Sequence, residues 1–178
     1  MFRNSFMIIT AHFIAAISSI ITIVLLPEQL SSKTFSLFFL FFFAFSVISW
    51  FYIYSYYSLQ KNKVKKIINT IGFNGKIISY MDSISGKSIH LNTNNGDILT
   101  IDVNKNKING YSFHEWSGFE LDDCTLTMKF NDIDAPVFII KSNGKIREFR
   151  HKLEAFGSNK YTTTNSFKEL VQRKLSPC

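Results

Sequence analysis

The sequence predicts a membrane protein in which an α-helical hairpin precedes a soluble α+β domain, made mainly of β-strands and closed by a C-terminal helix. Three observations support this fold class. Two apolar stretches without charged residues lie near the start of the chain, and a dense group of lysines follows the second stretch. Short stretches of alternating polarity then fill most of the remaining sequence, as is typical of half-buried strands.

The two apolar stretches, residues 6–26 and 35–57, contain no Asp, Glu, Lys or Arg. The first has 21 residues, and at about 1.5 Å per helical residue it reaches about 32 Å, enough to cross a hydrocarbon core. Neither stretch shows the polar stripe of a soluble core helix. A cleaved signal peptide is the alternative for the first stretch, but no small-x-small cleavage pattern follows it. We therefore predict a transmembrane hairpin over residues 1–60.

The charges next to the two spans predict their orientation. Arg3 precedes the first span, and four lysines follow the second within six positions: Lys61, Lys63, Lys65 and Lys66. Lys and Arg near helix ends are retained on the cytoplasmic side. We therefore expect a multi-pass protein of the bacterial inner membrane with both termini in the cytoplasm. The same lysines are candidate contacts for anionic membrane lipids, although setting the topology is a sufficient role for them.

The charge of the predicted folded domain argues against nucleic acid as a partner. Residues 67–157 contain ten Lys and Arg against eleven Asp and Glu, so the net charge of +7 lies elsewhere in the chain. A nucleic-acid-binding module would carry its positive charge on the folded domain. The expected partners are membrane lipids and a protein in the inner membrane, and a homo-oligomer is also compatible with the sequence.

Small side chains recur at helical spacing along the first span. They are Ala11, Ala15, Ser18, Ser19 and Thr22. A face of small residues lets another helix approach closely, and this helix is either the second span or a span of another copy of the chain. His12 lies on the same span and is a functional candidate as an ionisable group in the membrane, but a neutral, hydrogen-bonded or interface-seeking imidazole is expected there.

A basic juxtamembrane bridge over residues 61–74 is expected to lead into a β-rich domain over residues 75–157. Seven strands are predicted, at residues 76–81, 88–93, 97–103, 107–113, 118–123, 125–130 and 137–141. The Asn-Gly pair at 95–96 indicates a tight hairpin turn. Apolar residues then recur at helical spacing over 145–157, and Gly157 is expected to end this helix. The result would be a small barrel or sandwich closed by one helix.

The last segment, residues 158–178, predicts a polar linker and a short basic amphipathic helix. Ser166 and Glu169 have the spacing of a capping box. Apolar side chains would form one face of this helix, with Arg173 and Lys174 as further candidate contacts to the membrane surface. The helix would lie on the inner leaflet or dock on a partner, or else it is a frayed tail.

The sequence predicts no catalytic residue, no metal site and no cofactor, and hence no enzyme. Residues 85–88 resemble the end of a phosphate-binding loop. Such a loop needs a glycine five positions before Gly86, and Met81 stands there. The acidic pairs at 122–123 and 132/134 fall in turns, where Asp caps backbone groups. Cys124 is expected to be a small buried residue.

An aromatic segment at 113–119 holds the candidate contacts to a protein partner. These are Phe113, His114, Glu115 and Trp116. Aromatic side chains on a strand-to-turn segment can anchor an interface. Packing of Trp116 and Phe119 in the core is the alternative.

The order of elements resembles bacterial pleckstrin-homology-like (PH-like) domains, in particular uncharacterised two-span membrane proteins with such a domain in the cytoplasm. The resemblance covers residues 76–157 and rests on the closing segment: the strand LTMKF, the turn Asn131–Pro136, the strand VFIIK and the helix from Lys145. It implies a seven-stranded barrel or sandwich that scaffolds protein or lipid contacts. The layout is also similar to that of entry-exclusion proteins of conjugative plasmids, which implies binding or blocking of a membrane-complex partner. The alternative function is lipid-headgroup sensing or a membrane-surface scaffold.

Overall fold

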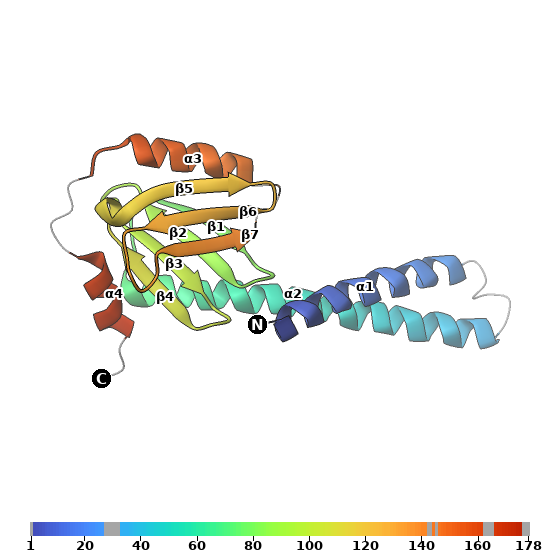
Figure 1. The fold of residues 1–178 in the computed structure, drawn as a ribbon. Helices are drawn as coiled ribbons and strands as arrows, with labels where there is room; N and C mark the ends of the chain where they lie inside the picture. The colour runs from blue at the N-terminus through green and yellow to red at the C-terminus, as the bar shows by residue number, and fades with distance from the viewer. Residues whose placement is uncertain (1, 27–32, 142–143, 145, 162–165, 176–178) are drawn as a thin grey trace. The chain divides into compact units, whose positions relative to one another are not determined.

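The computed structural model describes residues 2–26, 33–141, 144, 146–161 and 166–175 (Figure 1). The chain forms two compact units, Met1–Leu59 and Gln60–Cys178. The predicted connection between the spans lies largely outside the described residues, as does the terminal cysteine. The two units are described in turn.

The first unit contains helix α1 (Phe2–Leu25) and most of helix α2 (Lys33–Ile71). Both helices contain a segment long and apolar enough to cross a membrane, judged by length and composition. Their large apolar side chains are mostly exposed, for example Phe41 and Phe51. A core helix of a soluble protein would bury such side chains, so this exposure fits a lipid-facing surface better.

The small-residue face of α1 packs against α2 of the same chain. Ile8 and Ala15 of α1 are fully buried against Ile53 of α2. The hydroxyl oxygens of Ser19 and Ser46 lie 2.7 Å apart across the two helices. The sequence left two possible partners for the first span, the second span or a span of another copy. In the structure the first span packs on the second.

His12 is hydrogen-bonded at both ring nitrogens. Its Nδ1 lies 2.7 Å from the backbone oxygen of Ile8, and its Nε2 lies 3.3 Å from the hydroxyl of Tyr57. A carbonyl oxygen can only accept, so Nδ1 donates the hydrogen bond to Ile8. The ring of His12 is therefore held by hydrogen bonds within the helix pair.

The second unit begins with the end of α2 and contains all the strands. They are β1 (Ile77–Asp82), β2 (Lys87–Asn92), β3 (Ile98–Asp102), β4 (Lys107–Tyr111), β5 (Trp116–Asp122), β6 (Thr125–Phe130) and β7 (Val137–Lys141). A short 3-10 helix, η1 (Phe113–Glu115), precedes β5, and helices α3 (Ile146–Ser158) and α4 (Phe167–Leu175) follow β7. The seven predicted strands are confirmed, with bounds within two residues of the prediction.

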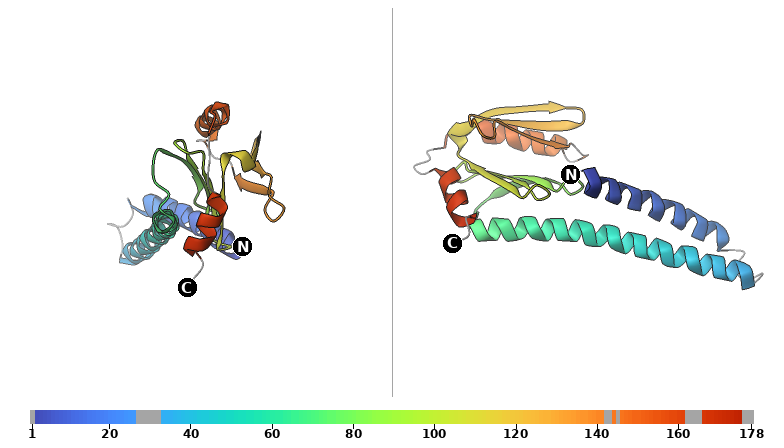
Figure 2. Two further views of the ribbon diagram at one scale, coloured as in Figure 1. Left: turned by 90° about the vertical axis from the view of Figure 1, so that its left-hand side faces the viewer. Right: turned by 60° about the horizontal axis from the view of Figure 1, so that its bottom comes forward.

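The strands form two antiparallel sheets, β1-β2-β3-β4 and β5-β6-β7. Within the described residues the two sheets do not join into a closed barrel. Their facing sides share one core, to which the first sheet contributes Ile89 and Ile98 and the second Leu126 and Met128. Helix α3 closes the space at one side and adds its own apolar face to this core (Figure 2).

The outer face of the first sheet has a second core. Leu99 and Ile101 of β3 pack there against Val64 and Ile71 of α2 and against α4. Strand β3 is therefore buried on both sides along its whole length. Residues 61–71, predicted as part of a basic bridge, continue α2 and cover this sheet. The helix ends at Ile71, and Gly72 follows it with a positive φ of 74°, which is typical of the residue after a helix C-terminus.

The tail helix α4 packs on its own domain. Phe167 and Val171 are buried against the first sheet, and Lys168 forms a 2.9 Å ion pair with Asp132. That hydrogen bond from Lys168 lowers the pKa of the Asp132 carboxyl. The membrane, partner and frayed-tail interpretations of α4 were therefore wrong about its apolar face. Amphipathicity shows that a helix has a face to bury, and it does not show what covers that face.

Gly110 of β4 makes this docking possible. A Cβ at position 110 would lie 2.6 Å from Cγ2 of Val171 and 2.8 Å from Cδ1 of Phe167. We expect Gly110→Ala to destabilise the docked α4 by about 1–3 kcal/mol, the usual cost of overpacking. Faster hydrogen exchange of the α4 amides would show this. Gly144→Ala is the control, because a Cβ there meets no atom within 4 Å; equal exchange rates in both variants would contradict the prediction.

Two further residues differ from the sequence-based prediction. Gly157 lies inside α3, which continues to Ser158, so it does not end the helix. Cys124 is exposed in the turn between β5 and β6 and is not a buried residue. Strand β5 ends at Asp122 and strand β6 begins only at Thr125, so Cys124 lies in the turn between them.

Candidate functional site

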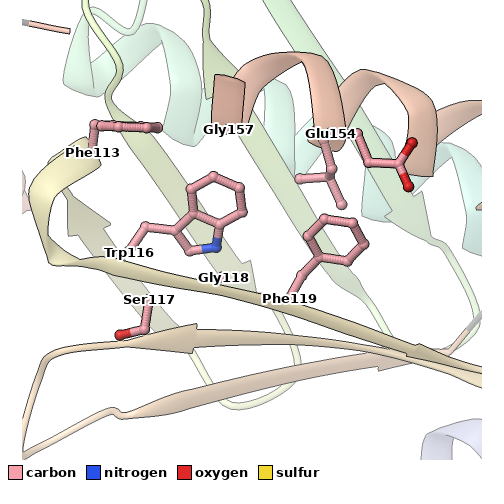
Figure 3. A pocket seen from close by; sticks show the side chains of 8 residues that line it. Phe113, Trp116, Ser117, Gly118, Phe119, Glu154 and Gly157 are labelled. Carbon is pink, nitrogen blue, oxygen red and sulfur yellow. The ribbon is translucent and has the colours of Figure 1, made fainter. Parts of the chain in front are cut away.

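A pocket of about 530 Å³ opens between β5 and α3 (Figure 3). Its lining consists of Phe113, Trp116, Ser117, Gly118, Phe119, Leu153, Glu154 and Gly157. The rings of Trp116 and Phe119 are nearly parallel, with centroids 6.4 Å apart. The pocket therefore offers aromatic walls with one acidic side chain, Glu154, among them.

A bulge in β5 places both rings on the same side of the strand. Trp116 pairs with Phe130, but Gly118 already pairs with Lys129, so Ser117 is an extra residue in the strand. In a regular strand, positions three apart point to opposite faces. Because Ser117 is an extra residue, Trp116 and Phe119 point to the same face of β5, and their rings lie next to each other. Gly118 has a φ of 125°, a conformation that glycine adopts far more readily than other residues.

Gly157 allows α3 to approach the indole of Trp116. A Cβ at position 157 would lie 3.2 Å from two carbons of the six-membered ring. A side chain at this position would require the indole to move by a few tenths of an ångström.

Strand β5 also has an unpaired edge next to the pocket. In the sheet order β5-β6-β7, the described strands pair with β5 on one side only. An edge strand presents backbone N–H and C=O groups that can pair with another strand. In addition, the buried Nε1 of Trp116 has no hydrogen-bond partner among the described residues. An indole N–H can only donate, so the site has an unused donor.

The predicted partner contacts fall into two groups. Phe113 and Trp116 line the pocket. His114 is exposed and does not line it, and the Glu115 carboxylate accepts the backbone N–H of Ser112 at 2.7 Å. Sequence reasoning missed the lining residues from α3. The signal available in the sequence was a glycine, Gly157, directly after the aromatic Phe156.

The predicted lipid contacts are exposed, but they do not form a single patch. On α2, Val64 and Ile71 are buried against the sheet. At about 100° per residue, Lys61 and Lys65 lie on one flank of this buried face, and Lys63 and Lys66 lie on the other. Arg173 and Lys174 are exposed at the end of α4.

Among the buried titratable groups outside the pocket, His90 and Asp97 have pKa values shifted by burial. His90 is flanked by the hydroxyls of Ser79 and Ser88, at 2.7 and 3.0 Å, and burial lowers its pKa to about 4. Burial raises the pKa of Asp97 to about 6, and a hydrogen bond from Asn95 opposes this rise. Neither residue lines the pocket.

The pocket lining carries three aromatic side chains and one carboxylate. Within the part of the chain that the structure describes, His, Cys, Asp and Glu do not group in threes suited to a metal ion. An aromatic pocket beside a free strand edge can accept an extended peptide, whose backbone pairs with the edge while a side chain enters the pocket. Comparisons of the chain with protein-family models, curated proteins and solved structures found no match.

Proposed function

We propose that this chain is a non-enzymatic membrane protein whose soluble unit binds or blocks a protein partner in the same membrane. The observation that supports this most is the pocket between β5 and α3, next to an unpaired strand edge. An extended segment of the partner would pair with β5 and insert an apolar side chain beside Trp116 and Phe119. Backbone pairing supplies affinity in such complexes, and the pocket supplies selectivity.

The proposal includes the location and the domain family. Helices α1 and α2 would span the inner membrane of a bacterium, with both termini in the cytoplasm. The uncharged apolar segments and the lysines after the second one support this topology. The second unit would be a PH-like domain, which is supported by its element order of four strands, three strands and a helix.

Photo-crosslinking in cells tests the proposed peptide site. A photoreactive amino acid at the exposed Ser117 should give an adduct with one defined membrane protein, and Trp116→Ala should lower its yield about tenfold or more. Trp116→Phe, which keeps a ring and removes the Nε1 donor, should give an intermediate yield. Each variant is first shown to be folded by its thermal unfolding.

The matched control is Ile139, which is exposed on β7 of the same sheet. Crosslinking from position 139 should not give the adduct, and Ile139→Ala should leave the yield from position 117 unchanged within about twofold. The same adduct from both positions, or a yield unaffected by Trp116→Ala, would show that the pocket is not the binding site.

Plasmid entry exclusion is the specific form of this proposal that the layout of the chain supports. Recipient cells that express the chain should then take up a conjugative plasmid less efficiently than cells with an empty vector. Trp116→Ala should restore uptake. Unchanged uptake with the native chain would remove this specific form and leave the peptide site to the crosslinking test.

A further inference from the structure

A second, smaller pocket of about 230 Å³ lies between the end of α2 and the β3–β4 hairpin. Lys63 and Lys66 line it from the helix, Asp102 and Asn106 line it from the hairpin, and Ile67 and Ile108 add apolar surface. It is separate from the pocket beside β5, with which it shares no lining residue.

Asp102 has basic neighbours of its own in the sheet. In the strand register it lies opposite Lys87 on β2 and opposite Lys107 on β4. Its Oδ1 also accepts the backbone N–H of Lys105 at 3.1 Å. Among the described residues Asp102 forms no ion pair within 4.0 Å, and neither do Lys63 and Lys66. Their ammonium groups are thus available to an external anion.

The hairpin adds positive charge around the same pocket. Lys105 and Lys107 are exposed on either side of Asn106, a lining residue with a left-handed φ of 51°. Four lysines from α2 and the hairpin therefore lie in or next to the pocket, against one carboxylate. This balance favours a ligand with negative charge.

The position of these lysines in the chain indicates which anion. Lys63 follows Tyr57, the last residue of the uncharged apolar stretch, by six positions, or about 9 Å along a helix. The headgroup layer is about 5–7 Å thick on each side of the hydrocarbon core. A lysine stem can extend back toward that layer, so the pocket is within reach of lipid phosphate.

We propose that this pocket binds the phosphate of an anionic phospholipid headgroup through Lys63 and Lys66, and that Lys61 and Lys65 take no part. The four lysines are equivalent for the topology of the chain, because all follow the second span closely. They are not equivalent in the folded unit, because Lys63 and Lys66 line the pocket and Lys61 and Lys65 do not. This proposal is independent of the peptide site beside β5.

Native mass spectrometry of the full chain in mild detergent tests the proposal. The native protein should retain one phosphatidylglycerol in preference to phosphatidylcholine. Lys63→Gln combined with Lys66→Gln should lower this retention about tenfold or more, because it removes both ammonium groups that line the pocket and would contact the phosphate. Lys61→Gln combined with Lys65→Gln removes the same charge from the same helix and should change retention less than about twofold.

Three outcomes would overturn the proposal. Equal losses in the two double variants would show that charge alone attracts the lipid, and no loss in either would place the lipid elsewhere. Displacement of the lipid by millimolar inorganic phosphate would identify free phosphate as the ligand. Lys63→Arg combined with Lys66→Arg keeps the charge and should retain the lipid, which excludes a loss of fold as the cause.

Discussion

Replacing Phe156 by alanine should lower the free energy of unfolding of the second unit by about 3–5 kcal/mol. Phe156 on α3 is 1% exposed. Its ring lies 5.0–5.6 Å from the ring centroids of Phe113, Trp116 and Tyr161. Truncation leaves a cavity between elements far apart in the sequence, and they cannot all move to fill it. Urea unfolding of the full chain in detergent, followed by near-UV circular dichroism, measures the loss.

The control for this variant is Ile133→Ala. Ile133 is also a large apolar residue of the second unit, but its side chain is 99% exposed in the turn before β7. Its truncation should change the free energy of unfolding by less than about 0.5 kcal/mol. A loss at Phe156 as small as the loss at Ile133 would contradict the packing of α3 described above.

His90 should make the second unit less stable in acid. Its folded pKa of about 4 is lower than its ordinary value of 6.5, so the unfolded chain binds a proton more readily between these values. The contribution of His90 to stability is full above pH 6.5 and is lost as the pH falls toward 4. At about 1.36 kcal/mol per pKa unit, the loss approaches about 3 kcal/mol. Urea unfolding at pH 7 and at pH 4 measures it.

His90→Gln removes the titrating group and should abolish this part of the pH dependence. The quantity compared is the change in the free energy of unfolding between pH 7 and pH 4. A loss of the hydrogen bonds to Ser79 and Ser88 that occurs at both pH values therefore cancels. An identical change in the native chain and in the variant would show that His90 is not the group responsible.

Asp97 opposes His90 over the same range. Its folded pKa of about 6 is higher than its ordinary value of 3.8, so its contribution favours the folded state at low pH and is lost as the pH rises through 6. Asp97→Asn removes this contribution and should make the loss of stability in acid steeper. A variant with both substitutions should show a weaker pH dependence than Asp97→Asn alone.

The strands could be predicted because their signals are local. The alternation of apolar and polar residues in TLTMKF gives the bounds of β6 without any knowledge of its neighbours. Asn95 and Gly96 likewise indicate the hairpin turn between β2 and β3. The glycines inside regular elements could not be interpreted in this way. Gly110 leaves room for Val171, and Gly157 leaves room for Trp116, and both partners are distant in the chain.

The pocket beside β5 depends on the same kind of long-range information. Its aromatic segment stood out in the sequence, but the bulge at Ser117 that aligns Trp116 with Phe119 is a property of pairing with β6. The residues of α3 complete the pocket only because that helix closes the two sheets. Neither the bulge nor the closure by α3 can be predicted from the order of residues along the chain.

Two apolar segments long enough to cross a membrane, seven strands and two amphipathic helices could all be predicted from the sequence. Each follows from periodicity and turn residues within a short window, where backbone geometry alone sets the pattern. The packing of α4 on the first sheet and the division of the α2 lysines between two flanks are visible only in the folded unit. Those features depend on which surfaces meet, and burial couples residues that no local pattern connects.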